Sequence, residues 1–405
     1  MIVSSRHGPF VGINSMMYKK SYKLLTIGND EVFRCWGVGG MGRWGDGEMG
    51  EWGNGRLKAS KPGMTANSNG LSNNQHPDAY TADTIHLKKP SVGPKGLIGP
   101  PCHGVMASVI VCTYNRAQLL ERLLESLSCQ TAPVDTFEII VVDDGSGDNT
   151  AGVCRRMMER MPNLKCLVMG SNSGLGAAGN RGAAAARGQY LLFTDDDCIP
   201  DPGWVEKMCA VLRDSPLVAG AMVSPRSNYF KLCHNIAQFY PFMPGQKAQK
   251  LDFIAGANMG IQANTIDEIG VFNTGTTTPD MEYILRARQR GFAITYAPGA
   301  VITHDPQRVT LGSVLAYAAA HAAETILLRH RFRELLRTPL VLFSPVLILL
   351  AAPVIAFKTT VGIYLGNRKL LRCFHTIPLV YLIKLAWCWG AARGLLSEKR
   401  KKNHE

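Results

Sequence analysis

Four short apolar runs, each about as long as a β-strand, recur between residues 107 and 198, and two of them end in consecutive carboxylates. The runs are ASVIVCTY (107–114), FEIIVVDD (137–144), KCLVMG (165–170) and QYLLFTDDDC (189–198). Between the first two, leucines recur at helical spacing from residue 116 to 130. This alternation predicts an α/β fold, with a Rossmann-like, mostly parallel sheet covered by helices. Such sheets bind ligands at the carboxyl ends of their strands, where the acidic clusters fall.

The glycine-rich segment GSNSGLGAAGN (170–180) has the G-x-G-x-x-G spacing of a dinucleotide-binding turn. A nicotinamide cofactor would also need one acid near the end of the next strand, to bind a ribose hydroxyl. Here that strand ends in Asp195, Asp196 and Asp197, which together would repel a pyrophosphate unless a cation lay between them. Because a nicotinamide cofactor needs no cation, the sequence disfavours this interpretation.

The D-x-D spacing of Asp195 and Asp197 suits a divalent cation. Mg²⁺ and Mn²⁺ prefer oxygen ligands and commonly also bind the phosphates of a nucleotide substrate. A cation held there would neutralise the charge of a departing nucleoside diphosphate. The acidic strand end therefore predicts transfer of a group from an activated nucleotide.

Six segments, from about residue 107 to residue 304, resemble in the same order the motifs of a family 2 glycosyltransferase with the GT-A fold. They are SVIVCTYNR (108–116), EIIVVDDGSGDNT (138–150), FTDDDCIPDPGW (193–204), AGANMGI (255–261), PDMEYILRARQRG (279–291) and YAPGAVITHD (296–305). The resemblance implies an inverting transfer of a sugar from a nucleotide sugar, with Mn²⁺ or Mg²⁺ as the cofactor.

The resemblance also implies roles for individual residues on the donor side. Tyr114 would pack against the nucleobase, Asp144 would bind the base, and Thr113 would offer backbone contacts. Asp195 and Asp197 match the pair of aspartates that holds the metal ion and the sugar nucleotide.

On the acceptor side, Asp280 falls where the family has its general base, which takes the proton of the acceptor hydroxyl as it attacks the anomeric carbon. His304 falls where some members supply a further metal ligand. Gly256 and Asn258 lie in the glycine-rich turn and are expected to contact the nucleotide sugar or the acceptor.

Two positions depart from the family pattern. The family often has Ala-Arg-Asn-x-Gly in its glycine segment, whereas AGNRG (178–182) has Gly179 in place of the arginine. Arg181 is the candidate to supply the missing positive charge to the nucleotide sugar. The family's Glu-Asp pair reads Pro279-Asp280, so the base is kept and its acidic neighbour is lost.

Each assignment has a structural alternative. Asp143 and Asp144 would equally cap the helix that follows them, and Asp280 would pair with Arg286 or Arg288. The other candidates have similar alternatives: core burial for Tyr114, a surface position for His304, and a purely structural turn for Gly256 and Asn258.

Composition divides the chain into five segments. Residues 1–105 hold many Gly, Asn, Pro and Trp but few apolar runs, which predicts a disordered extension, or sequence upstream of a start near Met106. The first residues lack the pattern of a secretory signal, so we expect that the chain is not exported. The other segments are a GT-A domain (106–310), a connector helix (311–337), membrane-embedded segments (338–396) and a basic tail (397–405).

Two apolar runs indicate membrane attachment. PLVLFSPVLILLAAPVIAF (339–357) has nineteen residues without a charge, long enough to cross about 30 Å of hydrocarbon. FHTIPLVYLIKLAWCWGAARGLL (374–396) carries Lys384 at its middle, which favours an interfacial position with Trp387 and Trp389 among the headgroups. The alternative is two buried helices of a soluble domain. The helix at 311–336 would lie along the membrane surface or cap the catalytic core.

Charge and cysteine content narrow the partners and the compartment. The net charge is +13, and its basic blocks flank the apolar runs, so we expect anionic lipids rather than nucleic acid as the partner. Eleven scattered cysteines without a C-x-x-C pair indicate a reducing compartment.

The sequence therefore predicts an inverting glycosyltransferase in the cell membrane, with its catalytic domain on the cytoplasmic side. Its partners would be a nucleotide-sugar donor, membrane lipids and a hydroxyl of a cell-envelope, polysaccharide or lipid-linked glycan acceptor. Two alternatives stay open. The altered arginine and glutamate positions would also fit a non-catalytic scaffold or binding module with the same fold. A nucleotidyltransferase would use aspartates and a metal too, but no basic glycine-rich triphosphate loop lies near the first strand.

Overall fold

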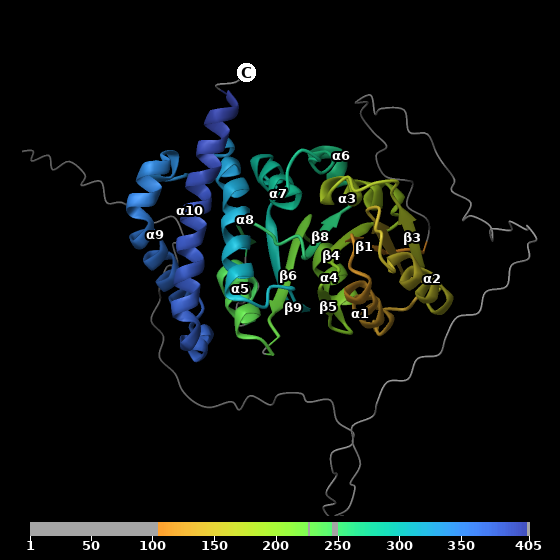
Figure 1. Ribbon diagram of the computed structural model, residues 1–405. Coiled ribbons are helices and arrows are strands. Elements are labelled where there is room, and N and C mark those ends of the chain that lie inside the picture. Colours follow the sequence, from red (N-terminus) through yellow and green to blue (C-terminus); the bar gives the residue numbers. More distant parts are fainter. Residues whose placement is uncertain (1–103, 226, 245–249, 403–405) are drawn as a thin grey trace, which may run out of the picture. The chain divides into compact units, whose positions relative to one another are not determined.

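The computed structural model describes residues 104–225, 227–244 and 250–402 (Figure 1). The predicted low-complexity extension, residues 1–105, lies almost wholly outside the described residues. From residue 107 to residue 212, strands and helices alternate in the order that the apolar runs predict.

Nine strands of the described part form one mixed sheet, in the order β3-β2-β1-β4-β8-β6-β9-β5, with β7 paired to β9. The strands β3, β2, β1 and β4 are parallel neighbours, and β8 runs antiparallel to β4. The predicted α/β fold is therefore confirmed, with a Rossmann-like half and a mixed half. The strands are β1 (Ala107–Thr113), β2 (Phe137–Asp143), β3 (Leu164–Val168), β4 (Tyr190–Asp195), β5 (Cys198–Pro200), β6 (Leu217–Val223), β7 (Lys250–Leu251), β8 (Asn258–Gln262) and β9 (Ile294–His304).

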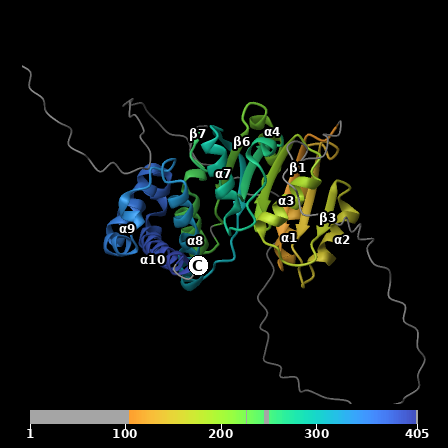
Figure 2. The same ribbon diagram turned by 90° about the horizontal axis from the view of Figure 1, so that it is seen from above.

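In the sheet half of the described chain, residues 104–310, helices connect these strands and cover the sheet (Figures 1 and 2). In α1, the leucines at helical spacing form the buried face, as predicted, and the charged residues point away from it. The helices are α1 (Ala117–Ser128), α2 (Thr150–Arg160), α3 (Leu175–Ala185), α4 (Trp204–Leu212), α5 (Tyr229–Phe239), α6 (Thr265–Ile269) and α7 (Pro279–Gln289).

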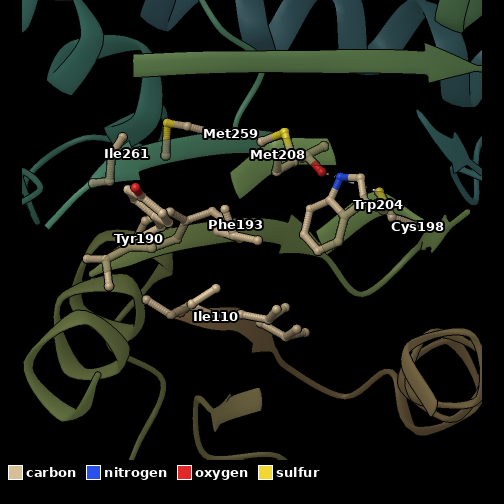
Figure 3. Packing of buried hydrophobic residues seen from close by; sticks show 14 of the residues in the cluster. Ile110, Tyr190, Phe193, Cys198, Trp204, Met208, Met259 and Ile261 are labelled. Atoms are coloured by element: carbon tan, nitrogen blue, oxygen red, sulfur yellow. Dashed lines mark hydrogen bonds between the residues drawn. The ribbon is translucent and has the colours of Figure 1, made fainter. Parts of the chain in front are cut away.

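The core of the sheet half lies on both faces of the sheet, against α4 as well as against α1, α2, α3 and α7, and Figure 3 shows part of it. Met208 and Leu212 of α4 face Gly260 of β8 and Leu192 of β4. Phe193 and Met259 point to the other face of the sheet, where Phe193 packs edge-on against Phe272. The indole Nε1 of Trp204 donates a hydrogen bond to Asn258 Oδ1 at 2.9 Å, so this buried aromatic ring has its polar atom satisfied. The contact fixes α4 against the end of β8 that faces the acidic residues.

The C-terminal part consists of three long helices, α8 (Leu311–Arg331), α9 (Pro345–Gly366) and α10 (Ile377–Lys402), with 3₁₀ segments η2 (Leu340–Phe343) and η3 (Arg368–Thr376) between them. In both views α8 lies between α10 and the sheet (Figures 1 and 2). Three segments, Leu311–Arg331, Pro345–Gly366 and Arg368–Arg400, are long and apolar enough to cross a membrane. The sequence pointed to two of these, and α8 adds a third.

Lys384, the charged residue inside the last apolar run, is turned toward the sheet half. Lys384 lies on α10, and its Nζ donates a hydrogen bond of 2.7 Å to the carbonyl oxygen of Ala237 on α5. A lysine at this depth would be costly if it faced lipid. Because it contacts protein instead, it does not oppose membrane insertion of α10.

Parallel pairing brings the acidic strand ends to one edge of the sheet. Thr113 of β1 is in register with Asp143 of β2, and Cys112 of β1 with Asp195 of β4. The backbone N–H of Asp144 donates to Thr113 O at 2.9 Å, which continues the pairing beyond the strand ends. The first two acidic clusters therefore meet where a parallel sheet binds its ligands.

The opposite end of this half is held together by one buried carboxylate, Glu138 on β2. Its Oε1 accepts hydrogen bonds from Ser108 Oγ at 2.8 Å and from the backbone N–H of Arg187 at 2.7 Å. Its Oε2 accepts from Lys165 Nζ at 2.9 Å. Burial alone would raise the pKa of Glu138, but the hydrogen bonds from Lys165, Ser108 and Arg187 outweigh it, so the pKa is lowered.

We expect Glu138→Gln to lower the free energy of unfolding by about 3 kcal/mol. The reason is that the side chains of Lys165 and Arg187 both form an ion pair with this carboxylate and would lose it. A lowered carboxyl pKa gives stability that is present above the ordinary value near 4.5 and is lost as the pH falls through the folded value. The difference between the two proteins should therefore shrink below pH 4.5. Urea unfolding at several pH values measures it. The control is Glu121→Gln, which breaks the exposed pair with Arg156 and should cost less than about 1 kcal/mol; equal losses in both variants would contradict the role of Glu138.

Candidate active site

A cluster of possible metal ligands lies at the acidic edge of the sheet. Asp195 ends β4, Asp197 follows in the turn before β5, and His304 ends β9. One ligand atom from each of the three residues lies within 4.8 Å of the others. The chain thus brings together two residues from one tight turn and a third from more than a hundred residues later.

The tautomer of His304 follows from its neighbour Asn235 on α5. The amide nitrogen of Asn235 donates to the carbonyl oxygen of His304 and to Ser224 Oγ, each at 2.9 Å. The amide oxygen must therefore face His304 Nδ1, which lies 2.7 Å away and donates the proton. The lone pair of His304 is then on Nε2. Burial lowers the pKa of this histidine, although Asp197 partly opposes that, so the ring is neutral near pH 7.

The unprotonated Nε2 of His304 faces Asp197 Oδ1 at 3.5 Å. The oxygen is buried and has no hydrogen-bond partner among the described residues. Two acceptors facing each other repel, and burial with the charges of Asp197, Asp196 and Asp280 raises the pKa of Asp195 well above its usual range. A divalent cation would remove both penalties, and two carboxylates with a neutral imidazole form a suitable ligand set. The residues present therefore fit a metal ion.

The middle aspartate of the three has a different set of contacts. Asp196 is buried, and its Oδ1 accepts from Arg116 Nη1 while its Oδ2 accepts from Thr113 Oγ1, each at 2.8 Å. Burial raises its pKa in spite of the nearby Arg116. Asp196 therefore ties β4 to the end of β1, which leaves Asp195 and Asp197 as the candidate ligands.

A groove with about 970 Å³ of empty space, including its open side, runs along this edge. One half is lined by Thr113, Tyr114, Asp144 and Gly174. The ring of Tyr114 is 44% exposed, so it offers a face to a ligand, whereas a core tyrosine would not.

Asp144 holds the wall of the groove in place. Its carboxylate accepts hydrogen bonds of 2.8 Å from the backbone N–H groups of Ser173 and Gly174. Gly174 has φ of 87°, a conformation that favours glycine, and it precedes the first turn of α3. Asp144 therefore does not cap the helix after the turn, which was the structural alternative to binding the nucleobase, and contacts the glycine-rich loop instead.

A smaller pocket beside the metal ligands contains the predicted base. It is lined by Asp195, Gly256 and Asp280, together with apolar residues such as Phe193 and Phe272. Asp280 lies in the first turn of α7, and its Oδ2 accepts from the backbone N–H of Gly256 at 3.0 Å. A Cβ atom on residue 256 would lie 2.7 Å from that oxygen, so glycine is needed for this close approach.

Two predicted site residues lie away from these pockets. Asn258 is buried, and its amide nitrogen donates to the carbonyl oxygens of Ala221 and Ala300, while its oxygen accepts from Trp204. Its donors are thus committed within the protein, which indicates a structural role. Arg181 lies in the second half of α3, and it lines neither pocket.

The groove also contains residues that the motifs did not indicate. His234, Phe239, Arg308 and Tyr317 line its other half, beyond the metal ligands. The sequence signal for His234 is the polar pair His234-Asn235, which interrupts the mostly apolar segment LCHNIAQF (232–239). Such a pair carries no chemistry until the fold places it beside His304.

Comparison with known proteins gives matches over the sheet and over the C-terminal helices. The model of glycosyl transferase family 2 matches residues 108–270, and that of glycosyl transferase family group 2 matches residues 190–390. The chain is 26% identical over 200 residues to glycosyltransferase AglE of Haloferax volcanii, which covers 49% of this chain and 66% of that protein. It is 36% identical over 107 residues to the putative glycosyltransferase EpsH of Bacillus subtilis, which covers 26% of this chain and 30% of that protein.

The chain thus matches less than two thirds of the length of these curated relatives. Among solved structures, mannosyltransferase PcManGT from Pyrobaculum calidifontis, in complex with GDP-Man and Mn²⁺, has the same fold with a TM-score of 0.51 and 21% sequence identity. The alignment covers 77% of this chain and 92% of that one. Together the two family models extend from residue 108 to residue 390, across the acidic strand ends and the C-terminal helices. The chain belongs to the family 2 glycosyltransferases.

Proposed function

We propose that this protein transfers a sugar from a nucleotide sugar to a hydroxyl group of a membrane-associated acceptor, with inversion at the anomeric carbon. The observation that carries the proposal is that Asp195, Asp197 and His304 line a nucleotide-sized groove, and that Asp195 also lines the adjoining pocket of Asp280. A donor that spans this arrangement has its diphosphate at the three ligands and its sugar beside a carboxylate.

The nucleoside of the donor is assigned to the half of the groove lined by Tyr114 and Asp144. The exposed ring of Tyr114 is available for stacking on a nucleobase. Asp144 is partly occupied by the glycine-rich loop, so it supports the wall and accepts from the base only with its remaining lone pairs. Thr113 contributes backbone contacts at the end of β1, since its side chain is bound to Asp196.

The metal ligands are Asp195, Asp197 and His304, and Mn²⁺ or Mg²⁺ is the ion that suits them. When bound, the ion would neutralise the nucleoside diphosphate as it leaves. The solved mannosyltransferase, which has the same fold, contains Mn²⁺, and this supports the choice of metal.

The base is Asp280, held toward the pocket by the backbone N–H of Gly256. Its carboxylate takes the proton of the acceptor hydroxyl, while the hydroxyl oxygen forms a bond to the anomeric carbon. The bond between that carbon and the diphosphate oxygen breaks, and its electron pair leaves with the diphosphate. Because the attack and the departure occur on opposite sides in one displacement, the configuration inverts.

We assign the acceptor to the membrane because α8 is one of the three helices able to cross a bilayer, and this helix directly follows the sheet half. A lipid-linked or cell-envelope acceptor would reach the pocket along this helix. We propose the cytoplasmic face for the sheet half, since α8 and α10 run parallel, so the basic residues of 329–333 and 398–402 lie at the same end of the apolar helices.

Replacing the base tests the function directly. Asp280→Asn should lower kcat for transfer by about 100- to 10,000-fold, because the amide cannot take the proton of the acceptor. Binding of the nucleotide with Mn²⁺, measured by calorimetry, should change little. The control Asp267→Asn alters an exposed acid on α6 and should leave transfer unchanged. Transfer at the wild-type rate by Asp280→Asn would remove this residue from the mechanism.

The contact between Asn235 and His304 predicts an effect on the metal. Asn235→Ala frees the imidazole of His304 to rotate and to change tautomer, so Mn²⁺ affinity should fall by about 10- to 100-fold. Calorimetric titration with Mn²⁺ measures it, with melting temperature as a check on folding. Asn163→Ala removes a distant hydrogen bond to Phe137 O and serves as the control. Unchanged Mn²⁺ affinity in the Asn235 variant would mean that His304 is not a ligand.

Membrane attachment predicts how the protein fractionates. The full chain should stay in the membrane pellet after washing with carbonate at high pH, which removes proteins that are held only by charge. Detergent should release it. Release by carbonate alone would show that the helices α8, α9 and α10 do not cross the bilayer.

A further inference from the structure

The second half of the groove has no role in the proposed reaction. Its lining residues are His234 and Phe239 of α5, Arg308 of the loop after β9, and Tyr317 of α8. Phe239 and His234 lie beside the candidate metal ligand His304, with ring centroids 5.0 Å and 6.3 Å from its ring. A groove of this volume has room for a second ligand beside the nucleotide sugar.

His234 is the first sign that this half binds something. Its side chain is 1% exposed, and neither ring nitrogen has a hydrogen-bond partner in the described part of the chain. Aromatic rings surround it, with centroids 5.0 Å away for Tyr317 and 6.2 Å away for Phe239. Leaving a buried polar atom unpaired has a cost in free energy, because the atom has lost its hydrogen bonds to water. A ligand with hydrogen-bonding oxygens would recover part of that cost.

Arg308 is the second sign. Its guanidinium lies over the ring of Tyr317, 3.7 Å from the centroid, and no described carboxylate is within ion-pair distance of it. Arginine presents several N–H donors in a plane and is well suited to phosphate. A guanidinium held on an aromatic ring at the wall of a groove is placed to bind an anion there.

The charged and titratable groups around His234 point to the same ligand. Arg308 faces it from the loop after β9, His304 from the strand end, His321 from α8 and Lys384 from α10. The imidazole of His321 stacks on Tyr317, and the ammonium of Lys384 is bound to a carbonyl oxygen rather than to a carboxylate. The neighbouring acids are the proposed metal ligands, whose charge the ion would offset. This half of the groove is therefore suited to a negative group.

The position of the site relates the anion to the membrane. Tyr317 and His321 belong to α8 and Lys384 to α10, two of the helices able to cross a membrane. Asp195 lines both the groove of Tyr317 and the pocket of Asp280, so the two sites adjoin each other. An anionic group in this half would thus be close both to the helices and to the reacting hydroxyl.

We propose that His234, Arg308 and Tyr317 form a subsite for a phosphate group of the acceptor, and that this phosphate is joined to an apolar chain embedded beside α8 and α10. The inference rests on the proposed function, because it takes Asp280 as the base for the acceptor hydroxyl. It assigns the subsite to the acceptor and not to the diphosphate of the donor. Holding the phosphate there directs the hydroxyl-bearing part of the acceptor toward Asp280.

The test is equilibrium binding by the full chain in phosphatidylcholine nanodiscs with Mn²⁺ present. The probes are dodecyl phosphate, dodecanol and inorganic phosphate. The wild type should bind dodecyl phosphate at least about tenfold more tightly than either of the others, since it alone has both the charge and the apolar chain. Arg308→Gln and His234→Phe should each lose most of that preference, and Arg308→Lys should restore part of it.

Two controls separate the subsite from the donor site and from folding. UDP and GDP binding with Mn²⁺ should stay within about twofold of the wild type in the Arg308 and His234 variants. Arg213→Gln, at an exposed arginine after α4, should leave every affinity unchanged, and melting temperatures confirm that the variants are folded.

Three results would overturn the subsite alone: equal binding of dodecyl phosphate and dodecanol, inorganic phosphate binding as tightly as dodecyl phosphate, or loss of nucleotide affinity in parallel with dodecyl phosphate affinity. The second would indicate a site for free phosphate, and the third a site for the donor diphosphate. Failure of the wild type to bind UDP or GDP with Mn²⁺ would instead overturn the proposed function, and the assignment of the subsite to an acceptor with it.

Discussion

Mutual repulsion among carboxylates at the ends of parallel strands is the constraint on which the rest of this structure depends. Asp195, Asp196 and Asp197 occupy one turn, and Asp280 acts on the same space from α7. The chain relieves part of this by pairing Asp196 with Arg116. The remaining two acids lie beside an imidazole whose lone pair also points inward, and together they form a ligand set that a divalent cation would stabilise.

The sequence was sufficient to predict the parallel half of the sheet and its acidic edge, because both follow from local pattern. Apolar runs define β1, β2 and β4, and the register of those strands then places their last residues together. The family resemblance added the base and the distant histidine. It could not tell which of three adjacent aspartates turns inward, since that is decided by Arg116 and Thr113 at the end of another strand.

The ligand contacts predicted for Asn258 and Arg181 show that a sequence motif does not determine where a side chain points. Asn258 lies in a glycine-rich segment of the expected kind, yet its amide binds Trp204 and two backbone carbonyls. Arg181 follows the glycine segment closely in sequence, but helical geometry carries it along α3 away from the groove entrance at Gly174. In both cases tertiary packing decides the direction of the side chain, and sequence spacing does not record it.

The helix α8 connects the sheet half to the helices that are able to cross a membrane. By composition α8 is apolar enough to cross a bilayer. Its residue Tyr317 nevertheless lines the groove, and His321, one turn later, stacks on that ring. Lys384 of α10 behaves in the same way, since its charge faces α5. Polar side chains on otherwise apolar helices are retained where they face protein or a cavity rather than lipid. Because Tyr317 lines the groove, α8 forms part of the wall of the groove and is at the same time long and apolar enough to cross a membrane.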